Sequence, residues 1–317
     1  MPPHRRISFE DVVPVQEFLR LDWYPKESDS RETWDRAWNR IQVSAAFYLI
    51  YYFFGDDWYR LVFRDIQDAN LFRDRRYIRY VKSPRIHPLT QWSLTGQPEF
   101  DARIIRLGQA LKLLGFGEYD TNLATKLDEL KSDGFAAANF ELKIAFIYAR
   151  AGFKAKFLTP PKGSKCPDLL VQRDGFETLV ECKKRKAVSD SPLPVRVGGV
   201  ADRLLDANSQ INSVGDHGIV YIEVEENLDY NSPEIRAYVD KISSILPQVP
   251  AVACVILTWE NITHPRPDVV SLSTEAFGLT NKTCSCTFPR QVWCNPAALA
   301  ARTPTEIVNL PPPMRAP

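Results

Sequence analysis

The feature that most constrains how this chain folds is the Asp-Gly pair at Asp174-Gly175, which lies between two apolar-rich segments, 168–172 and 176–182. Asp-Gly is among the strongest short-range signals for a two-residue type I′ hairpin, since both central residues of that turn need a positive φ. A two-residue loop also fixes how the flanking strands pair. We therefore predict an antiparallel hairpin with a defined register.

The predicted register places two carboxylates across from one another. Counting back from the loop pairs Asp168 with Glu181, and Cβ atoms paired in this way are about 4.5–5.5 Å apart. Side chains alternate between the faces of a strand, so Lys183 shares a face with Glu181 while Cys182 points the other way. Two acids and a lysine are thus expected on one patch.

Like charges held this close repel unless a positive group lies between them. Hard cations such as Mg²⁺ prefer oxygen ligands, use one or two carboxylates, and fill their other positions with water and substrate phosphate. The pattern therefore predicts phosphate chemistry. The alternative is a surface network of cross-strand ion pairs among Asp168, Glu181 and Lys183, which needs no ligand.

Composition places the chain among ordinary folded proteins, with 317 residues, 44% hydrophobic and 25% charged. The longest apolar run, 41–54, is too short to span a bilayer. No hydrophobic signal segment follows the first residues, and the six cysteines are scattered as in a reducing compartment. We expect a cytoplasmic protein without a membrane partner.

Three regions are expected along the chain. Aromatic residues recur at helical spacing through most of 1–134, which predicts an all-α N-terminal region that includes a long helix at 31–54. The segment 135–275 mixes helical and extended patterns, and 276–317 is expected to be an irregular extension with a proline-rich tail.

The middle region is predicted to be an α/β domain. A helical face follows Asn139, the expected N-cap, and ends before Gly152; a strand at 153–159 and the hairpin come next. The later elements are expected in the order helix, strand, helix and strand, at 197–213, 218–224, 233–246 and 251–259. This order indicates a mixed central sheet flanked by helices, with less regular structure from about residue 261.

The order of elements and the residues within them resemble one family. A helix that carries Glu141, a strand, a hairpin with Pro167-Asp168 and Glu181-Cys182-Lys183, and then a helix and a strand are similar to the PD-(D/E)xK nuclease superfamily, which has the restriction-endonuclease-like fold. The resemblance covers roughly 135–260.

The resemblance implies a set of roles. Asp168 and Glu181 would hold Mg²⁺, for which Mn²⁺ could substitute, with the backbone carbonyl of Cys182 as a third ligand. Lys183 would orient or help deprotonate the attacking water, and Glu141 would contact the metal through water or hold a second ion. Whether one metal or two are used stays open.

Two of the candidate residues have plain alternatives. Glu141 is equally well interpreted as an exposed acid in the first turn of a helix, where acids are favoured. Gln210 lies on the helix after the motif, where related nucleases often carry a polar site residue, but the Gln-x-x-x-Tyr pattern of one branch is absent because residue 214 is Val.

Two basic segments are candidates for nucleic-acid contact, since the net charge of +1 gives no global attraction. The first adjoins the motif and comprises Lys184, Arg185 and Lys186. The second lies between residues 60 and 85, where aromatic residues are interleaved with arginines that include Arg73, Arg75, Arg76 and Arg79. A solvated helix face would give the second pattern equally well.

The sequence thus predicts a Mg²⁺-dependent nuclease that hydrolyses phosphodiester bonds, with DNA as the expected substrate. A catalytically silent nuclease fold that binds nucleic acid or protein is the alternative. A third hypothesis makes the N-terminal helical region the functional binding or dimerisation module. A homodimer is compatible with the sequence.

Overall fold

The structure is a computed structural model that describes residues 31–59, 87–89, 98–117, 120–160, 164–184, 192–224, 227–266 and 269–286. The chain forms two compact units, one made of 1–118 with 304–317 and the other of 119–303. The second unit therefore includes the segment 119–134, which the sequence analysis grouped with the N-terminal region.

The described part of the first unit consists mainly of two helices that pack against each other, α2 (Arg31–Phe54) and α6 (Pro98–Gly115). The long helix predicted at 31–54 is confirmed, and Gly55 ends it with a φ of +87°. Gly108 permits the close packing, because a Cβ there would lie 2.6 Å from the Cα of Ala46.

The second unit is built on a six-stranded mixed sheet with strand order β1-β2-β3-β4-β5-β6. The strands β3, β4 and β5 run parallel, and the other neighbouring pairs are antiparallel. The strand bounds are β1 Lys154–Phe157, β2 Leu169–Arg173, β3 Phe176–Lys184, β4 Gly218–Glu223, β5 Val252–Arg266 and β6 Val269–Thr280. The mixed α/β class predicted from the sequence is confirmed.

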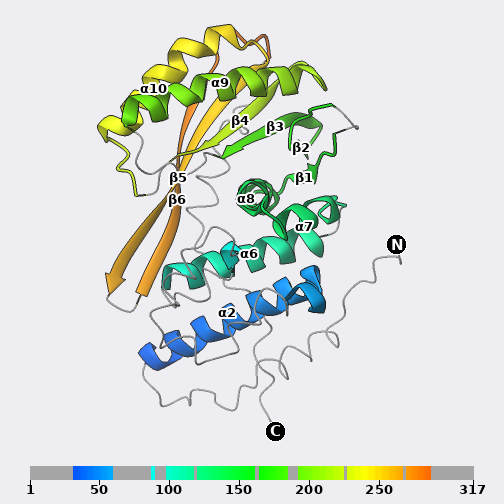
Figure 1. The fold of residues 1–317 in the computed structure, drawn as a ribbon, viewed down its shortest axis with the longest axis vertical. Helices are drawn as coiled ribbons and strands as arrows, with labels where there is room; N and C mark the ends of the chain where they lie inside the picture. The colour runs from blue at the N-terminus through cyan, green and yellow to red at the C-terminus, as the bar shows by residue number, and fades with distance from the viewer. Residues whose placement is uncertain are drawn as a thin grey trace. The chain divides into compact units, whose positions relative to one another are not determined.

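Helices cover both faces of this sheet (Figure 1). One face carries α8 (Phe135–Arg150), which packs on β1, β2 and β3 and is contacted by the short helix α7 (Ala124–Leu130). The other face carries α9 (Leu193–Asn212) and α10 (Pro233–Ile245). The 3₁₀ turn η3 (Leu246–Gln248) directly follows α10 in the chain.

Alternation along the parallel strands explains why both faces need cover. Val220, Ile222, Val255 and Leu257 point into the core under α9 and α10 and are fully buried. The intervening position Tyr221 faces α8, where its hydroxyl donates a hydrogen bond of 3.1 Å to that of Tyr148. Central parallel strands with apolar side chains on both faces are stable only between two helical layers.

The hairpin forms with the predicted register. Asp174 and Gly175 have φ values of +51° and +80°, as a type I′ turn requires. Leu169 lies opposite Val180, and the ladder runs to Arg173 opposite Phe176. The predicted register is therefore confirmed up to Leu169 and Val180, and the next pair counted from it, Asp168 with Glu181, lies just beyond the observed ladder.

Two expectations for the elements were wrong. Asn139 is not an N-cap, because α8 begins at Phe135 and Asn139 lies inside it. The chain after residue 261 is not irregular: β5 continues to Arg266 and β6 returns along it as an antiparallel strand. The polar residues of 261–266 resemble a loop in sequence but lie in β5, beyond its last pair with β4, where they pair with β6.

Among the helices that the structure describes, none is both long enough and apolar enough to cross a lipid bilayer.

Candidate active site

Asp168 lies just before β2, at the point where β3 continues without a β2 partner. Its Oδ2 accepts a hydrogen bond of 2.7 Å from the backbone N–H of Cys182. The last described pair of the β2–β3 ladder is Leu169 with Val180. Beyond that pair the Asp168 carboxylate, and not a backbone carbonyl of β2, accepts the hydrogen bond from the N–H of Cys182. This bond holds Asp168 against the segment of β3 that carries the Glu-x-Lys motif.

Glu181 and Lys183 form the second part of the site. The Glu181 side chain is only 2% exposed, and its Oε1 lies 2.6 Å from the Nζ of Lys183. The other oxygen, Oε2, is buried and has no hydrogen-bond partner among the described residues. Glu181 and Lys183 are therefore buried, unlike a solvated surface pair that would leave both oxygens in water, although Asp206 of the same cluster is 39% exposed.

Helix α9 fixes the position of Lys183. Its Nζ lies 2.7 Å from Oδ2 of Asp206 and also donates to Oε1 of Gln210. Gln210 in turn donates from Nε2 to the carbonyl oxygen of Cys166 at 3.3 Å, and Asp206 also pairs with Lys165 at 2.8 Å. The structure thus brings the predicted residue Gln210 into the site.

Asp206 was missed by the sequence analysis. The signal that could have found it is its spacing from Gln210, because residues four apart share one face of a helix.

Glu141 projects from α8 toward the same region. It is buried and lies beyond the first turn of the helix, so the interpretation as an exposed first-turn acid is wrong. Its Oε2 lies 2.6 Å from the Nζ of Lys126, which also pairs with Oε1 of Glu129 at 3.2 Å. Lys126, from α7, is a second lysine that the sequence analysis did not identify.

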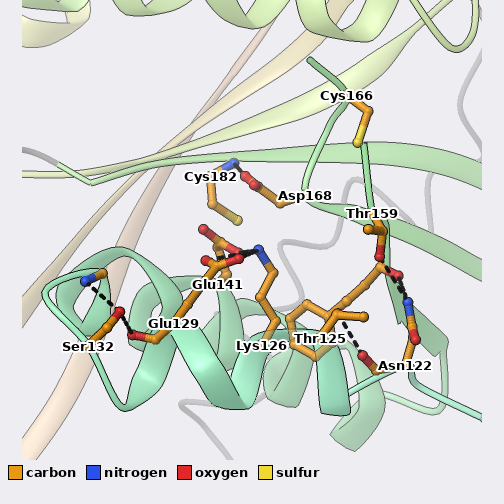
Figure 2. Close-up of polar contacts among 12 residues, drawn as sticks. Asn122, Thr125, Lys126, Glu129, Ser132, Glu141, Thr159, Cys166, Asp168 and Cys182 are labelled. Carbon is orange, nitrogen blue, oxygen red and sulfur yellow. Dashed lines mark hydrogen bonds and ion pairs between the residues drawn. The ribbon is translucent and has the colours of Figure 1, made fainter. Parts of the chain in front are cut away.

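Figure 2 shows the part of the site around Lys126, Glu141 and Asp168. The Nζ of Lys126 reaches the carboxylates of Glu129 and Glu141, while Asp168 meets the backbone of Cys182 on the neighbouring strand. Residues that are distant in the sequence therefore converge at one end of the hairpin.

The three central carboxyl groups share an unusual electrostatic environment. Burial, reinforced by the charge of Glu181, raises the pKa of Asp168 to about 7. Burial and the charge of Asp168 raise the pKa of Glu141 to about 7 against the opposing effect of Lys126. Burial also raises the pKa of Glu181 to about 6, although Lys183 lowers it. Carboxyl groups perturbed together in this way are typical of functional sites.

The pKa of Lys183 is also raised, which for a lysine favours the charged form. Burial lowers its pKa, but Glu181 and Asp206 outweigh burial, so the pKa of Lys183 lies above its ordinary value. The side chain is therefore a fixed ammonium group at neutral pH.

The donor set fits a hard divalent cation. Within the described part of the chain no three Asp, Glu, His or Cys side chains already surround a common point as a metal centre. Mg²⁺ does not need such a cage, since it binds through one or two carboxylates and keeps water and phosphate for the rest. Oε2 of Glu181 is buried and has no hydrogen-bond partner among the described residues, so it could coordinate such an ion.

Cys182 contributes through its backbone. Its thiol is fully buried and burial raises its pKa well above the ordinary value, so it is a neutral packing group. Its N–H orients Asp168, and the role of its carbonyl as a metal ligand stays a prediction.

Of the basic residues proposed to contact nucleic acid, the structure describes only Lys184. Its Nζ pairs with Oε2 of Glu223 at 2.8 Å, and Lys143 from α8 also lies near Glu223, at 3.5 Å. The remaining candidates lie outside the described residues: Arg73, Arg75, Arg76, Arg79, Arg185 and Lys186.

Comparison of the chain with protein-family models, with curated proteins and with solved structures found no match.

Proposed function

We propose that this protein is a Mg²⁺-dependent nuclease of the PD-(D/E)xK type. The observation that carries the proposal is the joint placement of Asp168, Glu181 and Lys183 at one end of the hairpin, with one buried Glu181 oxygen unpartnered. Site chemistry supports this assignment more strongly than the sheet does, because one fold hosts many functions.

In this proposal Asp168 and Glu181 hold the metal, with the carbonyl of Cys182 as a further ligand and Glu141 beside them; Mn²⁺ could replace Mg²⁺. The bound ion would supply charge at the phosphoryl oxygens and lower the pKa of a coordinated water. The protein's part is to keep two repelling carboxylates close, which the turn at Asp174-Gly175 and the Cys182 hydrogen bond both favour.

Lys183 is the proposed partner of the water and the phosphate. Asp206 and Gln210 fix its side chain, so its ammonium charge is held in place before substrate arrives, and preorganised charge is what stabilises a developing anion. We assign Lys183 to orienting the attacking water and offsetting charge on the phosphate, and Asp206 and Gln210 to positioning Lys183.

The reaction is hydrolysis of a phosphodiester. Water attacks phosphorus, and the bond from phosphorus to one ester oxygen breaks. The proton that the water loses is matched by the proton that the departing oxygen gains when it becomes an alcohol. The products are a phosphomonoester and an alcohol. We propose DNA as the substrate, bound in part through the basic residues that follow the motif, and we place the activity in the cytoplasm, consistent with the free thiols of the described cysteines.

A cleavage assay tests the proposal. Single- and double-stranded DNA and RNA are incubated with the full chain in Mg²⁺, in Mn²⁺ and in EDTA. Asp168→Ala and Lys183→Ala should each reduce cleavage by at least about a hundredfold, as loss of metal-site or charge-stabilising groups does. Asp202→Ala, an exposed acid one turn before Asp206 on α9, is the matched control and should cleave normally.

Activity that survives both substitutions belongs to a contaminant or to another site and would rule out the assignment. One observation favours the alternative of a silent nuclease fold that only binds: Lys126 and Lys183 already pair with the site carboxylates. Retained nucleic-acid binding with no cleavage in either metal would select that alternative.

A further inference from the structure

Lys126 is a buried cation that the proposed chemistry does not use. Its side chain is 9% exposed, and its Nζ lies 2.6 Å from Glu141 and 3.2 Å from Glu129. A buried ammonium is retained only when carboxylates compensate for its desolvation. Lys126 is therefore tied to the acidic side of the site.

The position of Lys126 is built into the fold. The loop before α7 is attached to the edge strand: the N–H of Phe157 donates to the carbonyl of Thr121 at 2.9 Å, and the Asn122 amide donates to the carbonyl of Phe157 at 3.1 Å. Figure 2 shows a further contact from Asn122 to Thr159. At the other end of α7, Leu130 is fully buried. Both ends of the helix are thus anchored around Lys126.

The site carboxylates differ in how they are paired. Glu141 has a lysine ammonium at ion-pair distance on its Oε2. Glu181 uses Oε1 for Lys183, and its Oε2 is buried with no hydrogen-bond partner among the described residues. Oε2 of Glu141 is also buried without a hydrogen bond, but the Lys126 ammonium lies 2.6 Å from it. Lys126 therefore already supplies a positive charge beside Glu141, while Oε2 of Glu181 is the oxygen that could bind a metal cation.

The formal charges agree with this division. Two ion-pair clusters lie at the site: Lys126 with Glu129 and Glu141, and Lys165 and Lys183 with Glu181 and Asp206. Asp168 is coupled by charge to both clusters, which together with it make a network of five carboxyl groups and three lysines. In its ionised form the network has a formal excess of two negative charges, which one divalent cation would neutralise. A second divalent cation would give the network a formal excess of two positive charges beside Lys126 and Lys183, whose side chains are only 9% and 14% exposed, which is costly.

We propose that Lys126 takes the place of a second metal ion, so that the site binds one divalent cation through Asp168 and Glu181 while Lys126 holds Glu141 away from it. This inference rests on the proposed nuclease function and decides the question of one metal or two, which the sequence left open. Lys126 is then a positioning residue that sets metal stoichiometry.

Calorimetric titration of Mn²⁺ into the full chain, without nucleic acid, tests the inference. The wild type should bind one ion per chain. Lys126→Gln, which removes the charge and keeps a hydrogen-bonding group for Glu141, should bind two. Lys126→Arg, which keeps the charge, should stay at one. Lys156→Gln, at an exposed lysine of β1, is the control for loss of a lysine and should also bind one ion.

A second pair of variants does not depend on how well Lys126→Gln folds. Asp168→Asn should weaken binding of the single ion by about tenfold or more, because even the loss of an outer-shell partner costs about 10–100-fold and Asp168 is a proposed ligand. Glu141→Gln should reduce that affinity much less than Asp168→Asn does, because in this arrangement Glu141 is not a ligand. An equal loss of affinity in both variants would overturn the inference.

The outcomes separate the inference from the proposed function. Two ions bound by the wild type, or one ion bound by a folded Lys126→Gln variant, would overturn the role of Lys126 and leave the nuclease proposal standing. Failure of the wild type to bind any ion, together with absence of cleavage in Mg²⁺ and Mn²⁺, would overturn both.

Discussion

At the scale of single residues, the site places several carboxyl groups in a buried environment that disfavours their ionised form. Asp168 and Glu141 each have a pKa raised to about 7, chiefly by burial. A raised carboxyl pKa means that ionisation is less favourable in the folded than in the unfolded chain. Such an arrangement destabilises the protein without its ligand, and a ligand cation relieves it.

The cost of ionising these buried carboxyl groups predicts that the stability of the protein depends on pH. The pKa of Asp168 rises from its ordinary 3.8 to about 7 on folding, so between these values the folded chain holds a proton that the unfolded chain has lost. Stability therefore falls as pH rises through this window. Asp168→Asn, whose amide oxygen can still accept from Cys182, should stabilise the protein by about 1–3 kcal/mol at about pH 8 and by less near pH 4.5.

Urea denaturation in EDTA at both pH values would measure this difference. Asp202→Asn, an exposed acid on α9, is the control and should change stability by less than about 0.5 kcal/mol. An Asp168→Asn variant that is less stable than the wild type at about pH 8 would contradict this argument from burial.

Asp206 gives a second prediction at this scale. It pairs with Lys183 and helps to keep the pKa of that lysine above its ordinary value. Asp206→Asn should lower kcat by about tenfold with little change in KM. Removing a carboxylate that favours the ammonium form lowers the pKa of Lys183, so the alkaline loss of activity should begin at a lower pH. A fall in kcat with an unchanged pH profile would indicate a merely structural role.

The residues of the site divide by how they could be predicted. Asp168, Glu181 and Lys183 followed from the turn chemistry of Asp174-Gly175, which fixes a local register. The turn does not predict Lys126 and Asp206, because their contacts depend on how α7 and α9 pack against the sheet. The spacing of Asp206 from Gln210 indicates a shared helix face but not what that face contacts. No local rule sets that packing.

At the scale of elements, the β2–β3 hairpin determines whether the site exists. Its turn requires a positive φ at both central residues, +51° at Asp174 and +80° at Gly175. A Cβ at residue 175 would meet nothing within 4 Å. The requirement for glycine there is therefore conformational and does not come from crowding.

Alanine substitutions at two glycines should have opposite effects. Gly175→Ala should destabilise the protein by about 1 kcal/mol, because alanine is strained at this φ. Gly198→Ala, inside α9 where a Cβ also meets nothing within 4 Å, should stabilise it by about 0.5–1 kcal/mol through higher helix propensity. Chemical denaturation of the two variants provides the comparison. A stabilising effect of Gly175→Ala would mean that the turn is not of the type described.

The elements also show where sequence patterns fail. Helices α2, α9 and α10 were predicted close to their observed bounds, because amphipathic periodicity and Gly or Pro near their ends are local signals. Strand β6 was missed because its alternation of Val, Ser, Leu and Thr is weak. What defines β6 is its long antiparallel pairing with β5, and pairing depends on the partner strand.

At the scale of the whole molecule, every described residue of the candidate site belongs to the unit 119–303. This unit contains its own core beneath α9 and α10. The other unit contains the arginine-rich segment 60–85, whose structure lies outside the described residues. The division of the chain therefore separates the proposed metal site from one of the two proposed nucleic-acid contacts.

Two fragments test this division. Fragment 119–303 keeps α7, Lys126 and the attachment of Asn122 to β1, so it should fold and bind Mn²⁺ with the affinity of the full chain. Fragment 136–303 lacks Lys126 and would leave Glu141 buried without its ion pair. Breaking a buried pair by removing one partner costs about 3–5 kcal/mol, so this fragment should be much less stable by circular dichroism and thermal melting.

Nucleic-acid binding by fragment 119–303 then shows what the first unit contributes. If arginines of 60–85 neutralise phosphates, the fragment should bind duplex DNA more weakly than the full chain. Each lost phosphate contact should also reduce the slope of log K against log salt by about 0.9. Equal affinity and slope for fragment and full chain would assign DNA contact to the sheet unit alone. Weaker binding with unchanged Mn²⁺ affinity would show that binding and metal chemistry reside in separate parts of the chain.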